Sequence, residues 1–472
     1  MNAERSSKSP AALMLAAQAH TRSIADRIEQ GRAMRKACSR QAQALWEPPA
    51  NRADPVELLV ENSRGRLENL VPIRYGRMMA SPFAFYRGAA AIMASDLAHT
   101  PHSGLFLQAC GDAHLLNFGG FATPERKLIF DINDFDETSI APWEWDVKRL
   151  VASFVIAGRA NGFKAKDCRE AAWIAAQSYR QSTAQYGQMP VLDAWYNAIE
   201  WDSIMDAMTD KAQKRFYSKK LAAAAAQSAH EKEFARLAHA EGNPARIIDQ
   251  PPLIFHADDI RDAEFRTVAE TTFARYLESI APERRLLLDR FELVDVAIKV
   301  VGVGSVGTYC GIALLMSGNG DPLFLQFKQA RQSVLEPYAG ASPYQHAGER
   351  VVHGQRLMQA ASDMFLGWMT GAGQDGLMFY MRQLRDAKIK PVVEIMNPNN
   401  LKGYAELCGH ALARTHARSA DAMQLSSYMG KSAAFEEALA DFAVAYADQN
   451  ERDHAALVAA VRAGRIEAQV EA

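Results

Sequence analysis

The sequence is poor in cysteine, in net charge and in long apolar runs, and each shortage excludes a class of protein. The five cysteines are scattered and include no CxxC pair, so we expect neither a zinc site nor a disulfide framework, and a reducing compartment fits. The formal net charge is -2, which gives no general attraction to nucleic acid or membranes. No apolar run reaches the roughly 18–20 residues that span a bilayer. We therefore expect a cytoplasmic protein that binds neither nucleic acid nor membrane.

The remaining composition is that of a globular protein, with 472 residues, 49% hydrophobic and 23% charged. This length is enough for two or three units with their own cores. The apolar pattern changes three times along the chain, from helical spacing to short β-branched runs and back. It predicts a helical N-terminal extension (1–60), a mainly helical part (61–290), a β-rich part (291–387) and a return to helices (388–472).

The β-rich part begins with a glycine motif. Gly302, Gly304 and Gly307, with Ser305 among them, fall between two apolar strand-like runs, and a third run ends at Lys328. Backbone N–H groups of such a hairpin can close over triphosphate oxygens without side-chain clash, and a lysine on the next strand can reach the phosphates. The alternatives are a structural hairpin with an exposed lysine and a dinucleotide site. A dinucleotide site needs a helix after the loop, whereas the pattern here continues as strand.

Residues 111–117 carry a second motif. Asp112, His114 and Asn117 follow a strand-like run within seven residues. Phosphoryl transfer needs a carboxylate to orient or accept the proton of the attacking hydroxyl, and hard oxygen ligands for Mg²⁺. Asp112 suits the first role and Asn117 the second. His114 is the other candidate catalytic residue, although it can equally be a structural hydrogen-bonding residue or the metal ligand of a hydrolase.

An acidic segment follows this motif. Asp134 lies 17 residues after Asn117 and is the first candidate for a metal carboxylate, with Asp131 and Asp136 as rivals. Acidic residues so close together repel each other unless a cation or hydrogen-bond donors compensate. The alternative is a network of acidic turns without a ligand. Cys110, at the end of an apolar run, is expected to be a buried small residue.

These motifs resemble known kinases. Residues 111–117 resemble the HGDxHxxN catalytic loop of aminoglycoside phosphotransferases and choline-kinase-like enzymes, with Cys110 in place of the first histidine. Residues 133–136 resemble their metal-binding aspartate segment. From about residue 60 the chain is more closely similar to an uncharacterised bacterial family of kinase-like domains, known as a domain of unknown function. That similarity rests on the segments SPFAFYRGAA, CGDAHLLNFG, FDINDFDET, VGVGSVGT, GERVVHGQR, ARTHARS and YADQNERD.

The resemblance implies an α+β, two-lobed, protein-kinase-like fold with large helical content. It implies a circular permutation, because the glycine loop and lysine follow the catalytic loop instead of preceding it. It also assigns roles: Asp112 would be the catalytic base, and Asn117 and Asp134 would be metal ligands, with Asp136 as a further candidate ligand. Lys328 would be the phosphate lysine, with Glu349 (or Glu336) as its helical ion-pair partner. Residues 381–384 would form the adenine hinge, and Asp146 would be a buried carboxylate that supports the catalytic loop.

The sequence leaves the roles of several basic residues open. Arg74, Arg77 and Arg87 could bind a substrate anion through their guanidinium groups, or form salt bridges on a solvated helix. Arg382 could bind a nucleotide or pair with a neighbouring acid. Arg414 and His416, on one predicted helix with Arg418, are expected to pack beside the catalytic loop.

The sequence thus favours a phosphotransferase that uses Mg²⁺ and ATP and acts on a hydroxyl of an unidentified small molecule or protein. Three alternatives are a nucleotide-binding regulatory module without turnover, a nucleotidyltransferase that uses the same pocket, and a metallohydrolase centred on His114.

Overall fold

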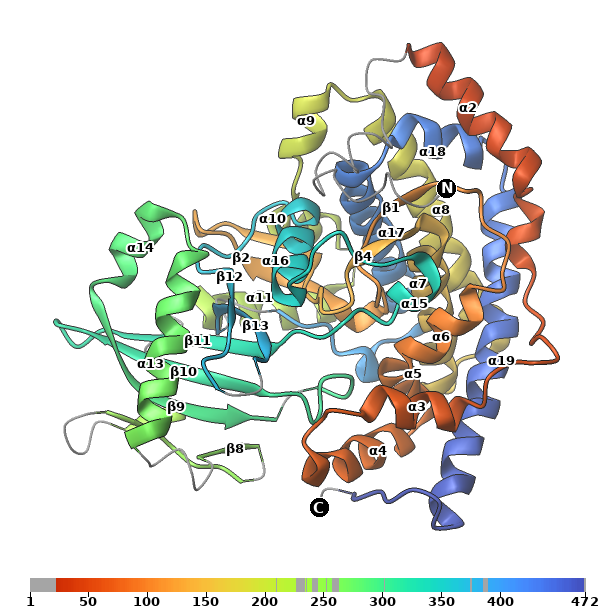
Figure 1. The fold of residues 1–472 in the computed structure, drawn as a ribbon. Coiled ribbons are helices and arrows are strands. Elements are labelled where there is room, and N and C mark those ends of the chain that lie inside the picture. The colour runs from red at the N-terminus through yellow and green to blue at the C-terminus, as the bar shows by residue number, and fades with distance from the viewer. Residues whose placement is uncertain are drawn as a thin grey trace, which may run out of the picture.

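A computed structural model of the chain describes residues 23–208, 210–225, 234, 236–239, 245–251, 253–256, 263–300, 302–373, 376–384 and 389–470. The protein is a mixed α+β structure with two parts. One part is built around a β-sheet, and the other is a larger assembly of helices (Figure 1).

The elements follow one another in an order that mixes the two parts. The helices are α2 (Ile24–Ala37), α3 (Pro55–Ser63), α4 (Val71–Met79), α5 (Pro82–Gly88), α6 (Ala90–Leu97), α7 (Trp143–Ala160), α8 (Ala165–Gln188), α9 (Val191–Tyr196), α10 (Trp201–Ala207), α11 (Lys211–Ala225), α13 (Ala263–Glu278), α14 (Pro282–Leu288), α15 (Glu336–Ala339), α16 (Ala347–Met358), α17 (Pro398–Ser419), α18 (Ala422–Met429) and α19 (Ala434–Arg462), with short 3-10 turns at Gln41–Ala44, Glu68–Leu70, Leu115–Asn117 and Val393–Ile395. The strands are β1 (Phe106–Ala109), β2 (Phe118–Ala122), β3 (Leu128–Ile132), β4 (Ser139–Pro142), β5 (Ile199–Glu200), β6 (Ala238–His239), β7 (Arg246–Ile247), β8 (Ile254–Phe255), β9 (Phe291–Lys299), β10 (Cys310–Ser317), β11 (Pro322–Gln329), β12 (Gly367–Thr370) and β13 (Met378–Gln383).

The main sheet has six antiparallel strands in the order β12-β13-β11-β10-β9-β8. The loop Ser317–Asp321, closed by a hydrogen bond from Ser317 N to Asp321 O, joins β10 to β11. One face of the sheet packs its apolar side chains against Tyr276 and Ile280, at the end of α13. The apolar runs on either side of the glycine motif and the run that ends at Lys328 correspond to β9, β10 and β11.

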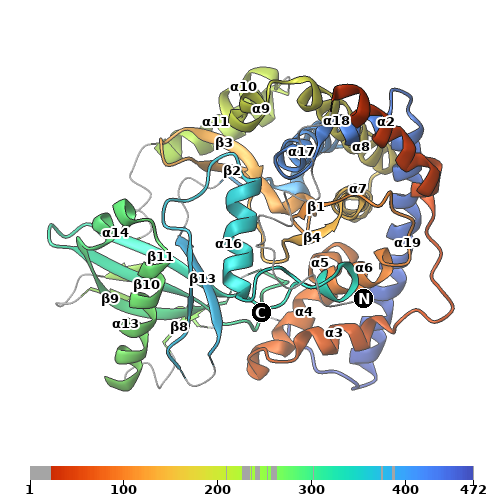
Figure 2. The ribbon, with the colours of Figure 1, turned by 45° about the horizontal axis from the view of Figure 1, so that its top comes forward.

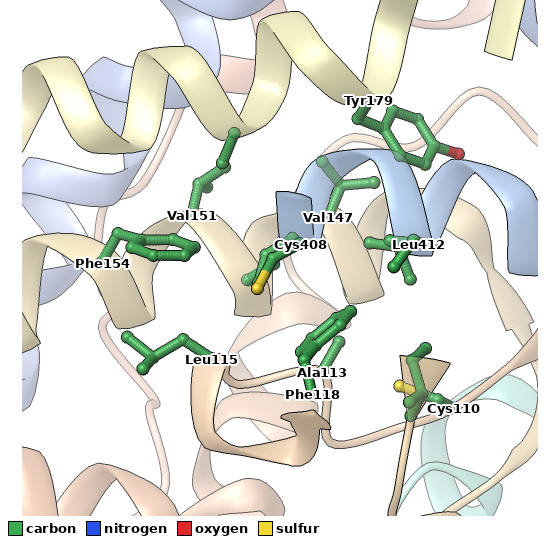
Figure 3. Packing of buried hydrophobic residues seen from close by; sticks show 14 of the residues in the cluster. Cys110, Ala113, Leu115, Phe118, Val147, Val151, Phe154, Tyr179, Cys408 and Leu412 are labelled. Atoms are coloured by element: carbon green, nitrogen blue, oxygen red, sulfur yellow. The ribbon is translucent and has the colours of Figure 1, made fainter. Parts of the chain in front are cut away.

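The helical part surrounds the largest apolar core. Helices α7, α8, α17 and α19 pack on one another, and Trp143 stacks on Tyr179 with ring centroids 5.8 Å apart. Figure 3 shows that Cys110, Ala113 and Leu115 point into this core, which places the backbone of the second motif directly on it. Burying such side chains stabilises the fold by about 25 cal/mol per Å² of apolar surface, so the motif rests on a rigid support.

Helix α16 connects the two parts. It lies between the sheet and the helices in Figure 2, and it contacts β12, β13 and α17. After β13 the chain re-enters the helical part, where α17 packs along α8. Helices from both ends of the chain therefore share one core, with the sheet inserted between them in sequence.

The predicted α+β class is confirmed, and helices return at α17 as the apolar pattern predicted. The five cysteines are free and buried. The short strands β5 to β8 were not predicted, since two-residue pairings have no periodic pattern. The predicted extension 1–60 is helical at α2 and α3, and its residues 1–22 lie outside the described part. Among the described helices, none combines the length and apolar character needed to cross a membrane.

A buried ion pair fixes the β2–β3 hairpin to α17. The Arg414 guanidinium lies 2.7 Å and 2.8 Å from the two carboxylate oxygens of Asp131, and neither side chain is exposed. Asp131 Oδ2 also accepts from the Ala360 N–H at 2.9 Å. Arg414 therefore binds β3 and the end of α16 rather than the loop 110–117, and its role is structural.

We predict that Asp131→Ala lowers the free energy of unfolding by about 3–5 kcal/mol, because it leaves Arg414 charged and buried without its partner. The double variant Asp131→Leu/Arg414→Met should recover most of this loss. Urea unfolding followed by circular dichroism measures both. Equal destabilisation by the single and double variants would contradict the assigned role.

Candidate active site

A buried carboxylate fixes the backbone of the loop 110–117. Asp146 of α7 accepts hydrogen bonds from the backbone N–H groups of Cys110 at 2.7 Å and Gly111 at 3.0 Å, and His416 Nε2 lies 3.2 Å from its Oδ2. Gly111 has a φ of +83°, and a Cβ there would lie 2.2 Å from the carbonyl oxygen of Glu137. Only glycine fits this turn. The predicted supporting role of Asp146 is confirmed.

Asp112 projects from this loop into a cavity and is held by an arginine. The Arg149 guanidinium lies 2.7 Å and 2.8 Å from Asp112 Oδ1, and it stacks over the ring of Tyr86 at 4.1 Å. The arginine is 3% exposed and the aspartate 20%. This pair fixes Oδ1, so that Oδ2 is the oxygen available to a ligand in the cavity.

His114 has a structural contact. Its Nδ1 accepts a hydrogen bond from the Leu116 N–H, and its Nε2 lies 3.8 Å from Asp112 Oδ2. Burial, with added repulsion from Arg149 and Arg87, lowers the pKa of His114 to about 4. The imidazole is therefore neutral near pH 7. One ring nitrogen is engaged by the backbone, which fits the structural interpretation better than metal ligation.

Asn117 closes the loop and faces the same cavity. Its side-chain Nδ2 donates to the backbone carbonyl oxygen of Asp112 at 2.8 Å, and its backbone carbonyl oxygen accepts from the Asn133 N–H at 2.7 Å. The bond through Nδ2 fixes the orientation of the side-chain carboxamide. These contacts join the Asp112 loop to the start of the acidic segment.

The structure separates the three aspartates of that segment. Asp131 is fully buried against Arg414 and is not part of the cavity lining, so it is excluded as a ligand in this arrangement. Asp134 and Asp136 line the cavity instead. Burial opposes the charge of Asp134, but Lys328 and Arg382 outweigh it and lower the pKa of this carboxyl below its ordinary value. Asp134 is thus an anion held among cations.

Lys328 brings the two distant motifs together. Its Nζ lies 3.0 Å from Asp136 Oδ2 and 3.8 Å from Asp134 Oδ2, and the lysine side chain is 6% exposed. Burial opposes its charge, yet these two carboxylates raise the pKa of Lys328 well above its ordinary value. The Tyr380 hydroxyl, opposite Lys328 in the sheet, donates to Asp136 Oδ1.

The glycine loop joins the same cluster. Ser305 Oγ donates to Asp136 Oδ2 at 3.3 Å, and Gly302 and Gly307 adopt φ values of +70° and +84°. The loop leads from β9 to β10, so no helix follows it and the dinucleotide alternative lacks its required element. Arg66 donates to the carbonyls of Gly304 and Val306 at 2.7 Å each, which ties the loop to the chain just after α3.

Glu349 does not join this cluster. Its carboxylate lies 3.7 Å from His353 Nε2, one turn along α16, while Lys328 pairs with the two aspartates. The alternative, Glu336, lies 3.6 Å from Arg350 Nε. The expected pairing of Lys328 with a helical glutamate is therefore not the one observed.

Arg350 of α16 makes the contact with the acidic segment that sequence reasoning missed. It donates to the carbonyl oxygens of Asp136 at 2.9 Å and Thr138, and to that of Arg331 at 2.8 Å. Nothing in the local pattern distinguished it from its neighbour Glu349, since its partners in the acidic segment are backbone atoms more than 200 residues away.

Two cavities meet at this cluster. The larger, of about 980 Å³, includes Lys328, Arg382 and Gln326 beside the sheet. The smaller, of about 650 Å³, includes Asp112 and Asn117 beside the helices. Both are lined by Gly302, Ser305, Asp134 and Lys390. Arg382, weighed as a nucleotide ligand, donates to the carbonyl oxygen of Asn133 at 3.2 Å at the wall of the larger one.

The chain is thus an α+β protein whose sheet and helical parts meet at a charged, double-chambered site. It belongs to the family described as "Uncharacterized protein conserved in bacteria (DUF2252)", whose model matches residues 66–460. The expected membership of an uncharacterised bacterial family is therefore confirmed. Neither a curated protein nor a solved structure matches the chain.

We predict that His114 makes the protein less stable as the pH falls from about 6.5 to 4. In that window the unfolded histidine binds a proton while the folded one does not, so up to about 3 kcal/mol of stability is lost. Urea unfolding at several pH values should show a shallower dependence in His114→Asn. The exposed His102→Asn is the control. An unchanged slope in His114→Asn would contradict the buried neutral assignment.

We also predict that Lys328→Met lowers the free energy of unfolding by about 1–3 kcal/mol. Removing the cation leaves Asp134 and Asp136 facing each other, but both are about a third exposed, which reduces the cost below that of a fully buried pair. The surface variant Lys127→Met should change stability by less than about 0.5 kcal/mol. Chemical denaturation in EDTA measures the difference. A stabilised Lys328→Met protein would contradict the account.

Proposed function

We propose that this protein is a phosphotransferase that uses Mg²⁺ and ATP and transfers the terminal phosphoryl group to a hydroxyl. One observation carries the proposal. Lys328, Ser305 of the glycine loop and the acidic segment converge on the single carboxylate of Asp136, although Ser305 and Lys328 lie 169 and 192 residues from it in the chain. A cation and a glycine loop facing carboxylates is the arrangement that phosphoryl transfer requires.

The fold supports a protein-kinase-like interpretation. The glycine loop lies between β9 and β10 of the sheet, and the Asp112 loop of the helical part lines the same cavity. The order in sequence is the reverse of that in ordinary kinases, as a circular permutation requires. Residues 398–462 return to the helical part, which is compatible with permutation because the inserted sheet part begins and ends there.

The residues present fit a magnesium ion at the junction of the cavities. Asp134, Asp136 and Asn117 offer hard oxygen atoms there, and Mg²⁺ commonly takes one or two carboxylates together with substrate phosphates. Among the described residues no group of three or more His, Cys, Asp and Glu side chains forms a metal cage, so a site of the all-protein kind is not proposed. A bound Mg²⁺ would supply charge neutralisation for the triphosphate.

The protein's own side chains have separate tasks in this scheme. Asp112 Oδ2 accepts the proton of the acceptor hydroxyl, whose oxygen forms a new bond to the γ-phosphorus. The bond from that phosphorus to the bridging oxygen breaks, and its electron pair leaves with ADP. Lys328 offsets negative charge on the phosphates, and Arg149 keeps Asp112 oriented. The proton is later released from Asp112 to solvent.

The alternatives are less well supported. A metallohydrolase centred on His114 would use an imidazole that is buried, neutral and hydrogen-bonded to the backbone through Nδ1. A nucleotidyltransferase would use the same pocket with ATP reversed, and only the products distinguish it. A regulatory module would bind ATP without consuming it.

We predict that Asp112→Asn slows ATP consumption by about 10²–10⁴-fold, the usual contribution of a positioned acid or base. The test follows ATP by ³¹P NMR in the presence of a set of hydroxyl compounds and of water alone. The wild type should form ADP together with a phosphate ester or inorganic phosphate. The exposed Asp202→Asn is the matched control and should retain the wild-type rate.

Each other result has a distinct meaning. Formation of AMP and pyrophosphate would replace phosphoryl transfer by nucleotidyl transfer. ATP that is bound but never consumed by the wild type would favour the regulatory module. Metal-dependent hydrolysis that is indifferent to Lys328→Ala would favour the metallohydrolase.

A further inference from the structure

The smaller cavity holds a cluster of arginines beside Asp112. Arg66, Arg74, Arg87 and Arg331 all line it. They come from α4, α5 and the loops after α3 and β11, so four separate segments supply positive charge to one space. A cavity of about 650 Å³ has the size of a small-molecule site.

Three of these arginines donate hydrogen bonds to neutral atoms. Arg74 donates to Ser63 Oγ at 2.7 Å, to Asn62 Oδ1 at 2.9 Å and to the Gly88 carbonyl at 3.1 Å. Arg66 and Arg331 likewise donate to backbone carbonyls or to Asn62. Within the described ranges no carboxylate forms an ion pair with any of the four. The expectation of salt bridges on a solvated helix is wrong for Arg74, which is 1% exposed.

The carboxylates that share this cavity do not cancel the charge. Asp112 is paired with Arg149, and Asp134 and Asp136 with Lys328. Burial raises the pKa of Glu137, whose carboxylate accepts from the Val334 N–H. The other two, Glu61 and Glu394, are exposed.

Burial and repulsion between arginines oppose the charges of Arg66 and Arg74. Burial, followed by the charges of Arg74 and Arg331, lowers the pKa of Arg66, and burial lowers that of Arg74 to about 10. Guanidinium groups remain charged under such conditions. Glu137 attracts Arg66, Arg74 and Arg331 from a distance, and Asp112 and Glu394 attract Arg87. Positive charge gathered in this way without a contacting carboxylate favours binding of an external anion.

Arg87 has the least satisfied guanidinium of the four. Its Nε is buried without a hydrogen-bond partner, as is Arg74 Nε, but Arg74 donates through its other nitrogens. Asp112 and Glu394 attract the charge of Arg87, which in turn opposes protonation of His114. A buried donor without a partner costs free energy in the ligand-free protein, and a ligand oxyanion would remove that cost. The ligand oxyanion is therefore expected next to Arg87, in the cavity that also contains the proposed catalytic base Asp112.

We propose that the acceptor is a small hydroxyl compound that carries an oxyanion, a phosphate or a carboxylate, held by Arg87 together with the rest of the arginine cluster. The proposal rests on the proposed function and specifies its substrate class. Planar guanidinium groups match both oxyanions through paired hydrogen bonds. The hydroxyl end of such a compound would face Asp112 in the same cavity.

The cluster is separate from the proposed nucleotide chamber. None of the four arginines lines the larger cavity, whose cations include Lys328 and Arg382. Arg66 binds the glycine loop, so the separation applies to Arg74, Arg87 and Arg331. This separation also makes the two sites distinguishable by mutation.

The test uses the nucleotide-free full chain and three matched probes: glycerol 3-phosphate, glycerate and glycerol. Thermal shift should show a rise of a few degrees with at least one of the two anions and none with glycerol. Arg87→Met should weaken anion binding about tenfold or more, since a hydrogen bond to a charged group is lost. Its own unfolding temperature should be equal to or higher than that of the wild type. Arg87→Lys should bind with intermediate affinity.

Two further variants locate the anion. Lys328→Ala should keep the anion-induced shift, and so should Arg32→Ala, an exposed arginine on α2. A shift with phosphate alone or with glycerate alone identifies which oxyanion is preferred, and both results support the proposal. Equal shifts with glycerol, retention of binding in Arg87→Met, or loss of binding only in Lys328→Ala would overturn it.

The inferred substrate class can be wrong while the proposed function holds, and the proposed function can be wrong while the anion site exists. ATP conversion to ADP without any anion-induced shift would reject the substrate class alone. An Arg87-dependent anion shift in a protein that never converts ATP would reject phosphoryl transfer and keep the anion site.

Discussion

The site depends on one buried cation. Lys328 carries its charge into the interior of the protein, where desolvation is costly, and Asp134 and Asp136 compensate for it. The same contact holds the sheet against the helical part, because the lysine belongs to β11 and the aspartates to the loop after β3. Ser305 and Tyr380 add hydrogen bonds to Asp136. Lys328 lines the larger cavity and Asp136 the smaller one, so the contact that joins the two parts also lies between the two cavities.

Around that pair, other buried charges position the loops. Asp146 holds the backbone of the Asp112 loop, Arg149 holds the Asp112 carboxylate, and Arg350 holds the carbonyls of the acidic segment. Each is a charged group with several hydrogen bonds inside a packed core, where a missing partner is expensive. Because burying these charges costs free energy, we infer that the groups that they orient have a function. Among these groups, Asp112 and Asp136 are carboxylates that line the smaller cavity and accept hydrogen bonds.

The sequence predicted local elements and single-motif roles far better than partners. Strand and helix periodicity located β9 to β13 and α16, and the resemblance led to the confirmed role of Asp146. The sequence could not show which of Asp131, Asp134 and Asp136 faces the cavity. Asp131 is withdrawn from it by Arg414, which lies 283 residues after Asp131 in the chain. The resemblance implied Glu349 as the partner of Lys328, whereas the neighbouring Arg350 makes the contact with the acidic segment. Partnerships between distant segments follow from packing, which local patterns do not encode.

The measurement that tests the account most directly is a thermal-shift titration with Mg²⁺–ATP on the wild type, Lys328→Ala and Asp134→Ala. A ligand present at about 100 times its Kd adds roughly 2.7 kcal/mol to the stability of the state that binds it. The account predicts that the wild type is stabilised by a few degrees and that both substitutions abolish the shift, since the two residues face one nucleotide. No shift in the wild type at millimolar Mg²⁺–ATP, or a shift that both variants retain, would contradict it.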